Sequence, residues 1–533
     1  MAAIVHQFDK RSGITYAYES VSYWDKEKKQ SRCKRTLIGR VDIATGKIIP
    51  TRKKYETLDS KPKQGPVPTI VTTRSFFGTT YLFDEIGKQL GITADLKQCF
   101  PDTYKQIFSI AYYLIMEDKN PLSRFSKWSK LHKHPYEKDI PSQRSSELFA
   151  SITEESKERF FHLQGKRRIE QEYWAYDTTS ISSYSESLRQ VRYGKNKDSE
   201  PLPQINLALL FGEESNLPFY YRKLAGNITD VKTVKNLLAD MNFIGYDKIK
   251  LVMDRGFYSE ANINGLYQNH YKFLIATRIS LKFVKKELDK VMDTLNTWPN
   301  YSDKYELYST MVPITWEYSQ QRPYKGDTIK GERRMYLHLY YNSEKALEDE
   351  KSFNKLLSVL QAELETGQRL VEHEKQYTKY FEVKSTPIRG SKVTPDLDVI
   401  AEAKRYYGYF ALMSNEVKES ITALEIYRNK DVVEKAFGDL KERLNLRRTA
   451  VSSEQSLEGK LFIEFVALIY LSYIKKQMQE KNLFKTYTMQ QALDELDVIE
   501  CFEQSGLHLR VGEVTNRQAE LFMNFGVSPP TSL

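Results

Sequence analysis

The spacing of apolar residues changes along the chain and predicts a mixed α/β protein. Apolar runs or alternation favour strands, and apolar residues at every third or fourth position favour a helix. Between about 172 and 278 the two patterns follow one another. The expected order is strand, strand, strand, helix, strand, helix, strand, over 172–177, 204–211, 217–227, 228–243, 248–254, 258–270 and 271–278. Asp177 ends the first strand and Asp254 ends the fourth.

This order is that of an RNase H-like mixed sheet flanked by helices, in which side chains at strand ends share a cleft. Charged helices and aromatic strands interrupt it from 279 to 405, which indicates an inserted α+β subdomain. A strand at 406–415 then resumes the sheet, and a helix is expected over 427–448. The apolar run 461–474 predicts a buried helix.

The residues before this core divide into two regions. Strand and turn patterns cover about 1–58, and 79–163 is mostly helical, with the Pro- and Lys-rich stretch 60–69 as a linker. Eleven Lys or Arg against three Asp or Glu between Trp24 and Lys54 fit either a solvated hairpin or a nucleic-acid arm. The helices fit a helix-turn-helix DNA reader or a plain bundle. The expected divisions are 1–75 (basic, β-rich, with the linker), 76–168 (helical, DNA-binding), 169–278 and 406–480 (catalytic core), 279–405 (insertion) and 481–533 (C-terminal, helical).

Composition narrows the classes of partner. A net charge of +10 and a sequence pI near 9.0 favour a polyanion. Three scattered cysteines are too few for a disulfide framework or a zinc site. The start of the chain lacks the apolar core of a signal peptide, and the run 461–474 is too short to span a bilayer and contains Glu464. We therefore expect a cytoplasmic protein without a membrane role.

Three acidic residues are candidates for a metal site. Asp177 and Asp254 end two strands, and Glu434 lies on the helix expected over 427–448. Taken singly, Asp177 could start a turn, and Asp254 could form an Asx turn or a cap. Taken together, three carboxylates suit Mg²⁺, with Mn²⁺ as a substitute. Two such ions can flank a phosphodiester, one activating the attacking oxygen and one stabilising the leaving oxygen.

The helix expected over 427–448 has two ordered faces. Its apolar stripe is suited to a core, and Tyr427, Lys430, Glu434 and Lys441 fall within an arc of roughly 60° beside it. The face could be an ordinary exposed one with a Lys430–Glu434 pair. A phosphodiester substrate explains it better, because the two lysines would neutralise phosphates beside the carboxylates and Tyr427 would donate a hydrogen bond or pack on a sugar. The stripe consists of Val433, Ala436, Phe437, Leu440 and Leu444.

These residues resemble a known family. The spacing Tyr-x2-Arg-x3-Glu-x6-Lys is the signature of a large group of bacterial insertion-sequence transposases with an Asp-Asp-Glu site. Here it reads Tyr427, Lys430, Glu434 and Lys441, with Lys430 in place of the arginine, which keeps the charge but loses bidentate phosphate recognition. "YDTTS" at Asp177, "MDRGFYS" at Asp254 and the preceding "GNITD" are also similar to the family.

The resemblance implies a cut-and-paste DNA transposase. Such an enzyme binds the terminal inverted repeats of its element in double-stranded DNA, cleaves the ends with two Mg²⁺ ions and joins the 3′-hydroxyls to target DNA. It also implies a homodimer in the synaptic complex and a bacterial or archaeal, nucleoid-associated setting. We expect Arg255, next to Asp254, to contact DNA. The alternatives are an RNase H-like structure-specific nuclease and a non-catalytic DNA-binding protein derived from a transposase.

Two tryptophans of the insertion have different expected positions. Trp298 is followed by Pro and Asn, which predicts a turn, and Trp316 lies in an apolar, strand-like run. A hairpin intermediate at the DNA end would force a base out of the stack, and Trp298 could bind that base by stacking. Alternatively, both tryptophans belong to the core.

Overall fold

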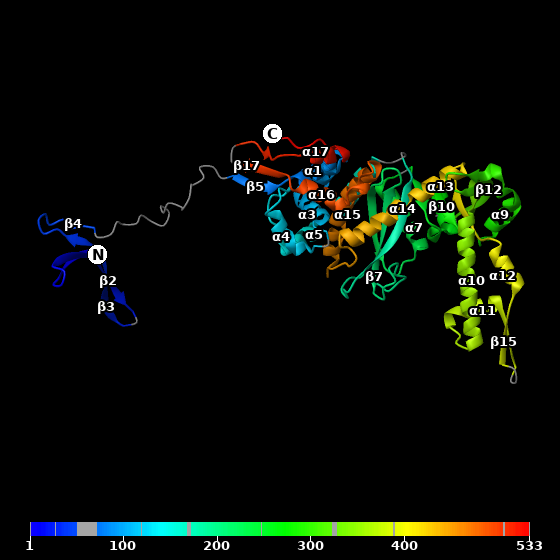
Figure 1. The fold of residues 1–533 in the computed structure, drawn as a ribbon, viewed down its shortest axis with the longest axis horizontal. Coiled ribbons are helices and arrows are strands. Elements are labelled where there is room, and N and C mark those ends of the chain that lie inside the picture. Colours follow the sequence, from blue (N-terminus) through cyan, green and yellow to red (C-terminus); the bar gives the residue numbers. More distant parts are fainter. Residues whose placement is uncertain are drawn as a thin grey trace. The chain divides into compact units, whose positions relative to one another are not determined.

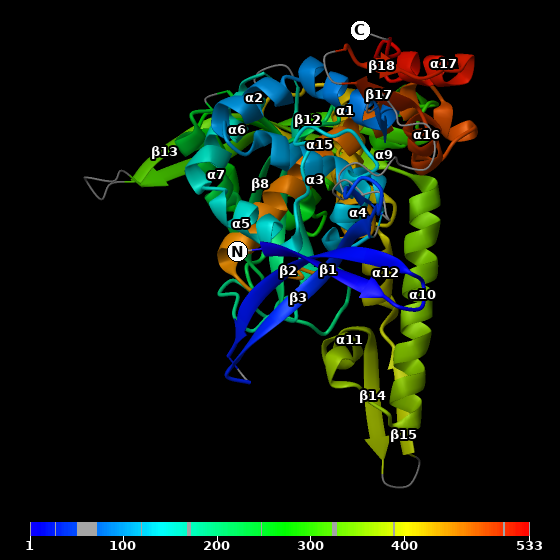
Figure 2. The same ribbon diagram turned by 90° about the vertical axis from the view of Figure 1, so that its left-hand side faces the viewer.

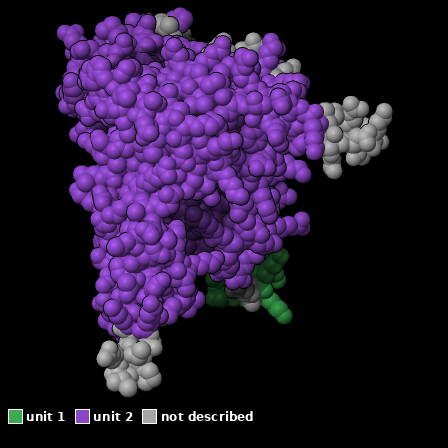
Figure 3. Space-filling model, turned by 90° about the vertical axis from the view of Figure 1, so that its right-hand side faces the viewer, with its two compact units in different colours: residues 1–71 green, residues 72–533 purple. Residues whose placement is uncertain are grey.

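A computed structural model of the chain describes residues 2–26, 28–50, 72–118, 120–167, 172–246, 248–321, 328–386, 390–504 and 507–531. The linker predicted at 60–69 lies outside the described residues. The chain divides into two compact units, Met1–Val71 and Thr72–Leu533, which Figure 3 colours separately. Among the described residues, no helix is long and apolar enough to cross a membrane.

The first unit is the β-rich segment expected at the start of the chain. Its four strands pair in sequence order, and every pairing is antiparallel. The strands are β1 (Ala2–Asp9), β2 (Ile14–Asp25), β3 (Gln30–Val41) and β4 (Ile48–Ile49). The long β2–β3 hairpin places Arg32 opposite Tyr23 and Lys34 opposite Val21. Its side chains are largely exposed, so this sheet has very little core of its own.

The second unit is built on a nine-stranded mixed sheet (Figure 1). Its order is β11-β12-β13-β16-β10-β9-β6-β7-β8. Within this order β6, β9 and β10 are parallel to one another, and the other pairings are antiparallel. The strands and helices of the predicted alternation are β6 (Trp174–Ser182), β7 (Gln204–Gly212), β8 (Pro218–Ala225), α7 (Asp230–Ile244), β9 (Lys250–Met253), α8 (Glu260–Gln268) and β10 (Lys272–Thr277).

The predicted succession of these seven elements is confirmed, and the sheet is consistent with an RNase H-like core. One boundary is wrong: β6 does not end at Asp177 but continues to Ser182. The reason is that "TTSIS" keeps pairing with β7, with Asp177 opposite Leu209 and Ser182 opposite Gln204. Asp177 therefore lies in the middle of a strand that is buried along its whole length.

The segment from 279 to 405 contributes two different structures. α9 (Lys282–Leu295), β11 (Tyr301–Ser302), β12 (Leu307–Gln321) and β13 (Thr328–Tyr341) extend the nine-stranded sheet, because β13 pairs with β16 (Tyr409–Ser414). The remainder packs round a small separate core that includes Phe353, Leu360 and Tyr377. Figure 2 shows its long α10 beside the β14–β15 hairpin. Its elements are α10 (Ser343–Thr366), α11 (Glu374–Tyr380), β14 (Phe381–Thr386), β15 (Gly390–Pro395) and α12 (Leu397–Lys404).

The helical region before the sheet shares its core with the predicted buried helix, α15 (Glu454–Glu480). Phe462 of α15 packs against Phe100 and Phe160, and Tyr470 packs against Tyr112. These helices therefore form one body with the sheet. They are α1 (Gly78–Gln89), α2 (Ile92–Cys99), α3 (Tyr104–Met116), α4 (Phe125–Ser129), α5 (Ser142–Ser151) and α6 (Glu154–Lys166).

The C-terminal stretch, expected to be helical, is only partly so. It holds α16 (Met489–Asp497) and α17 (Asn516–Asn524), but also β17 (Glu500–Gln504) and β18 (Arg510–Val511). β17 pairs with β5 (Thr72–Phe76), so strands from the two ends of the second unit form one small sheet. A pairing between residues more than 400 positions apart leaves no local signal in the sequence.

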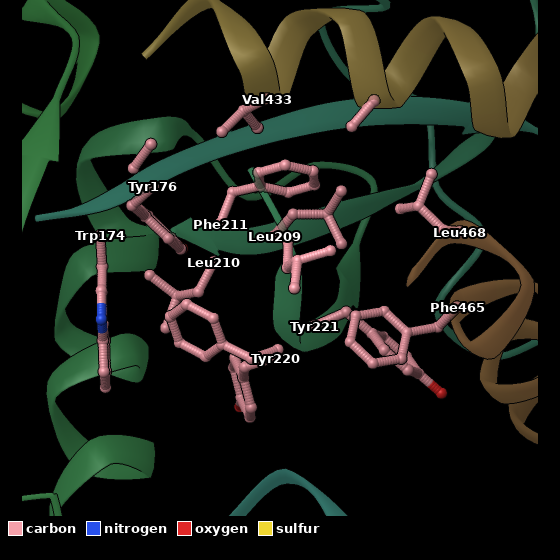
Figure 4. Packing of buried hydrophobic residues seen from close by; sticks show 14 of the residues in the cluster. Trp174, Tyr176, Leu209, Leu210, Phe211, Tyr220, Tyr221, Val433, Phe465 and Leu468 are labelled. Carbon is pink, nitrogen blue, oxygen red and sulfur yellow. The ribbon is translucent and has the colours of Figure 1, made fainter. Parts of the chain in front are cut away.

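The helix predicted over 427–448 is broken into three pieces. α13 (Ser420–Asn429) ends before Lys430, α14 (Asp431–Gly438) begins after it, and a π-helical turn follows at Asp439–Arg443. The predicted apolar stripe is confirmed, since all five of its residues are buried. Figure 4 shows Val433 of α14 above Phe211 of β7, and Phe465 of α15 beside Tyr221 of β8.

Candidate active site

Asp177 and Asp254 follow the last pair of a parallel ladder. β6 and β9 pair from Trp174 opposite Leu251 to Tyr176 opposite Met253. The next residue in each segment is an aspartate: Asp177 continues β6, and Asp254 lies directly after the end of β9. Because neighbouring parallel strands alternate their side chains in step, the two carboxyl groups start from equivalent positions on the same face of the sheet.

The two carboxyl groups have different surroundings. Asp177 Oδ1 accepts a hydrogen bond from the Thr178 amide at 2.7 Å and lies 3.4 Å from Lys197 Nζ. Burial raises the pKa of Asp177, although Lys197, Thr178 and Lys430 oppose the rise. Asp254 Oδ1 accepts a hydrogen bond from the Tyr427 hydroxyl at 2.7 Å. Burial alone would raise its pKa, but Tyr427, the Arg255 amide and two nearby cations together hold that pKa below its usual value.

Lys430 carries its charge into the space between the three candidate carboxylates. The side chain leaves the junction of α13 and α14, where the residue is only 3% exposed. Its Nζ lies 3.4 Å from Glu434 Oε1. Its charge opposes the burial that raises the pKa of Asp177, and it helps Tyr427 and the Arg255 amide to hold the pKa of Asp254 below its usual value. Glu434, by contrast, has a side chain that is 62% exposed. Lys430 is thus buried at the junction of two helices, while Glu434, one turn later, stays at the surface.

The other residues predicted for DNA binding are Lys441, Arg255 and Trp298, and each has different surroundings. Lys441, in the π-helical turn, donates to Asp198 at 2.7 Å in the β6–β7 connection. Arg255 is exposed next to Asp254. Trp298 is 79% exposed on a short turn, as its Pro and Asn neighbours predicted, and its ring stacks on Tyr301. Trp316 is buried in β12, as expected.

The structure adds two residues that the sequence reading did not identify. Lys197 lies in the β6–β7 connection, and its Nζ donates to both the carbonyl and the hydroxyl of Thr178. Asp230 begins α7 and accepts a hydrogen bond from the Thr178 hydroxyl at 2.6 Å. Asp230 belongs to "GNITD", a motif that did signal the region, whereas nothing in "KNKDSE" distinguishes Lys197 from its basic neighbours.

The three candidate carboxylates are of the chemical type that binds a hard cation, although their side chains do not stand together as a metal-binding group. Among the described residues, no three His, Cys, Asp or Glu side chains stand together as a metal-binding group. Both contacts of Asp177 named above involve Oδ1, which leaves Oδ2 of this carboxylate for a cation. Two lysine ammonium groups already lie against the acidic side chains, so a metal cation bound there competes with them for the carboxylates. Carboxylate oxygens in this setting are the ligands that Mg²⁺ prefers.

Comparison with known proteins gives one family match. The family model described as "Transposase DDE domain" matches residues 170–470, more than half of the chain. This span contains Asp177, Asp254 and Glu434. No curated protein matches the chain.

The chain is also similar to a solved structure. It is a cryo-EM structure of the piggyBac transposase synaptic complex with hairpin DNA, with 11% sequence identity and a TM-score of 0.31. The similarity covers 84% of this chain and 77% of that one. The family itself is given by the match over 170–470: the chain belongs to the DDE transposase domain family.

Proposed function

We propose that the protein is a cut-and-paste DNA transposase of the insertion-sequence group with the Tyr-x2-Arg-x3-Glu-x6-Lys signature. It binds the terminal inverted repeats of its element, cleaves phosphodiester bonds there and joins the 3′-hydroxyl ends to target DNA. The observation that carries this proposal is the register of β6 and β9, which brings Asp177 and Asp254 to equivalent strand positions within the family's matched span.

Asp177, Asp254 and Glu434 are the residues that would hold the metal ions. Use of divalent metals is general in this family, and we assign two Mg²⁺ ions, replaceable by Mn²⁺. When bound, these ions activate the attacking oxygen and stabilise the leaving oxygen of an in-line displacement. Glu434 has to approach the two aspartates for this, and its exposed side chain on the first turns of α14 has the freedom to do so.

The chain's own residues prepare the site before the metal arrives. Tyr427 holds one oxygen of Asp254, which fixes that carboxylate relative to α13. Lys430 screens the repulsion between the three acidic groups. The exposed Arg255, next to Asp254, supplies a cation for the DNA backbone. Lys441 does the same once DNA competes with Asp198 for its ammonium group.

The divisions of the chain receive roles in the same proposal. The basic β-rich segment 1–75 and the helical region 76–168 recognise the element ends, and 169–278 with 406–480 forms the catalytic core. The insertion 279–405 binds the cleaved DNA end. The region 481–533 has a structural role, because its strand β17 pairs with β5. A homodimer would hold both ends, and the setting would be the bacterial or archaeal nucleoid.

The test uses duplexes that carry the sequences flanking the coding region, incubated with the full-length protein and Mg²⁺. We expect nicking at the ends and, with added plasmid, joined products. Replacing Asp177, Asp254 or Glu434 with Ala should abolish cleavage and leave end binding largely intact. Glu442→Ala removes an exposed carboxylate from the same helical segment and serves as the matched control. Normal nicking by Asp254→Ala would overturn the assignment.

The same assay separates the two alternatives. A structure-specific nuclease of this fold would cut branched or hybrid substrates without preference for the flanking ends, and it would produce no joined product. A non-catalytic DNA-binding protein would shift the ends but leave them intact with any metal. The presence of all three carboxylates argues for catalysis, because a derived binding protein has no need to keep them.

A further inference from the structure

Lys197 lies between two aspartates: Asp177, a candidate metal ligand, and Asp230, which is not one of the three candidate ligands. Its Nζ lies 3.4 Å from Asp177 Oδ1 and 3.8 Å from Asp230 Oδ2. It is also held by the Thr178 carbonyl and hydroxyl, and the Lys197 amide donates to Ser180 Oγ at 3.2 Å. The backbone anchor fixes the loop, so the ammonium group needs to move very little to favour one carboxylate over the other.

Asp230 is held in place through Thr178, whose hydroxyl also accepts a hydrogen bond from Lys197. It starts α7, and its Oδ1 accepts the Thr178 hydroxyl hydrogen at 2.6 Å. On its other side, a Cβ added to Gly256 would lie 3.5 Å from Asp230 Oδ2, so the carboxylate also borders the turn after Asp254. Asp230 is therefore a fixed anion that lies next to both Lys197 and the turn after Asp254.

We infer that Lys197 and Asp230 together regulate the binding of a divalent cation to Asp177. Without the cation, the Lys197 ammonium neutralises Asp177. When a cation binds Asp177, its charge repels the ammonium group, which then moves fully onto Asp230. Lys197 thus competes with the metal, and Asp230 relieves that competition. The two residues are positioning residues and do not touch the substrate.

This inference rests on the proposed function, since it takes Asp177 as a metal ligand. It makes a distinctive prediction, because two residues that contact each other should have opposite effects. Removing Lys197 should strengthen cation binding, since nothing then competes for Asp177. Removing the charge of Asp230 should weaken cation binding, since Lys197 then has only Asp177 to pair with. A merely structural network would give the same sign for both.

The experiment measures Mn²⁺ binding to the full-length protein without DNA, by electron paramagnetic resonance of the free ion. We expect Lys197→Gln to tighten binding and Asp230→Asn to weaken it, each by about two- to fivefold, the scale of a partly exposed charge pair. The double variant should bind like Lys197→Gln. Lys195→Gln removes the same charge from an exposed position in the same loop and should bind like the unmodified protein.

Thermal melting gives a second measurement on the same proteins. Lys197→Gln should lower the Tm in EDTA, and saturating Mn²⁺ should remove that difference. Weaker binding in both single variants, or no change beyond that of Lys195→Gln, overturns the inference. If Lys197→Gln does not fold, unchanged Mn²⁺ binding by Asp230→Asn overturns it equally.

Asp177→Asn separates this inference from the function on which it rests. If Asp177→Asn binds Mn²⁺ as well as the unmodified protein does, the metal assignment itself fails. If Asp177→Asn loses Mn²⁺ binding while Lys197→Gln and Asp230→Asn behave alike, only the role of the Lys197–Asp230 pair is wrong.

Discussion

The Tyr427 hydroxyl donates a hydrogen bond to Asp254 Oδ1 at 2.7 Å, and this bond joins α13 to the end of β9. The two residues are 173 positions apart in sequence. The tyrosine that starts the Tyr427, Lys430, Glu434, Lys441 pattern is therefore in direct contact with the second candidate aspartate. Burial and the charge of Asp254 raise the pKa of Tyr427 far above its usual value, so the phenol stays protonated and remains a donor.

Tyr427→Phe tests this bond through stability and its pH dependence. The pKa of Asp254 is lowered in the folded protein, so its contribution to stability is present above the unfolded value of 3.8 and is lost as the pH falls. Without the hydroxyl, burial dominates and that pKa rises. We expect a loss of about 1.5–3 kcal/mol at pH 7, the range for a hydrogen bond to a charged group. Urea unfolding should show that the difference in unfolding free energy between the unmodified protein and Tyr427→Phe becomes smaller below about pH 4.

Lys430 is a buried cation among acidic groups, which makes its removal costly. Lys430→Met should destabilise the protein by about 3 kcal/mol, because acidic side chains lose their buried counter-charge. Added Mg²⁺ should restore part of the stability, since it supplies the missing positive charge. Differential scanning fluorimetry with and without Mg²⁺ measures both effects. Lys435→Met, at an exposed position of the same helix, is the control and should change little. Equal effects of the two variants would contradict the buried role of Lys430.

The succession of strands and helices along the chain and the buried apolar stripe at Val433–Leu444 were predictable, because each depends on local spacing. The break at Lys430 was not, because "YRNKDVVEKAF" carries a continuous helical pattern without Gly or Pro. Helical spacing puts Lys430 and Glu434 on one face, so it gave no sign that Lys430 is buried while Glu434 is exposed.

Contacts between segments that are far apart in the sequence could not be predicted from it either. Lys197, Thr178 and Asp230 meet only because β6, its following loop and α7 fold together. Likewise, the aromatic strands of the insertion gave no sign that β13 pairs with β16 and extends the main sheet. Strand pairing is set by tertiary packing more than by the composition of each strand.

The basic first unit gives a prediction about DNA binding. Deleting residues 1–71 should leave the Tm of the remainder unchanged, because those residues form a compact unit of their own. A deletion up to residue 165 would instead remove Phe100 and Phe160 from the core that they share with α15. We expect the 1–71 deletion to lower affinity for element ends and to flatten the salt dependence. Each lost phosphate contact reduces the slope of log K against log salt by about 0.9. An unchanged slope would exclude this unit from the DNA interface.

Trp298 is an exposed aromatic residue that we predict binds a displaced base. Its ring stacks on Tyr301, with centroids 5.5 Å apart and an interplanar angle of 21°. The same loop is tied to α13, because Lys304 and Tyr305 both bond Glu425, and the Arg428 guanidinium lies 4.8 Å from the Tyr305 ring. α13 also carries Tyr427, so the exposed ring belongs to a loop anchored on the helix that contacts Asp254.

If the reaction passes through a hairpin at the DNA end, a base must leave the stack, and stacking on an aromatic ring offsets that cost by roughly 1–3 kcal/mol. On a pre-nicked end, Trp298→Ala should therefore reduce hairpin formation and release at least tenfold, while first-strand nicking on an intact end survives. Trp298→Phe keeps an aromatic face and should recover most of the lost rate. Denaturing gels resolve the nicked, hairpin and released products. A parallel fall of both steps in Trp298→Ala, or no change in either, would show that Trp298 is not a stacking platform. The exposed ring would then need another role, because it contributes little to the core from the surface.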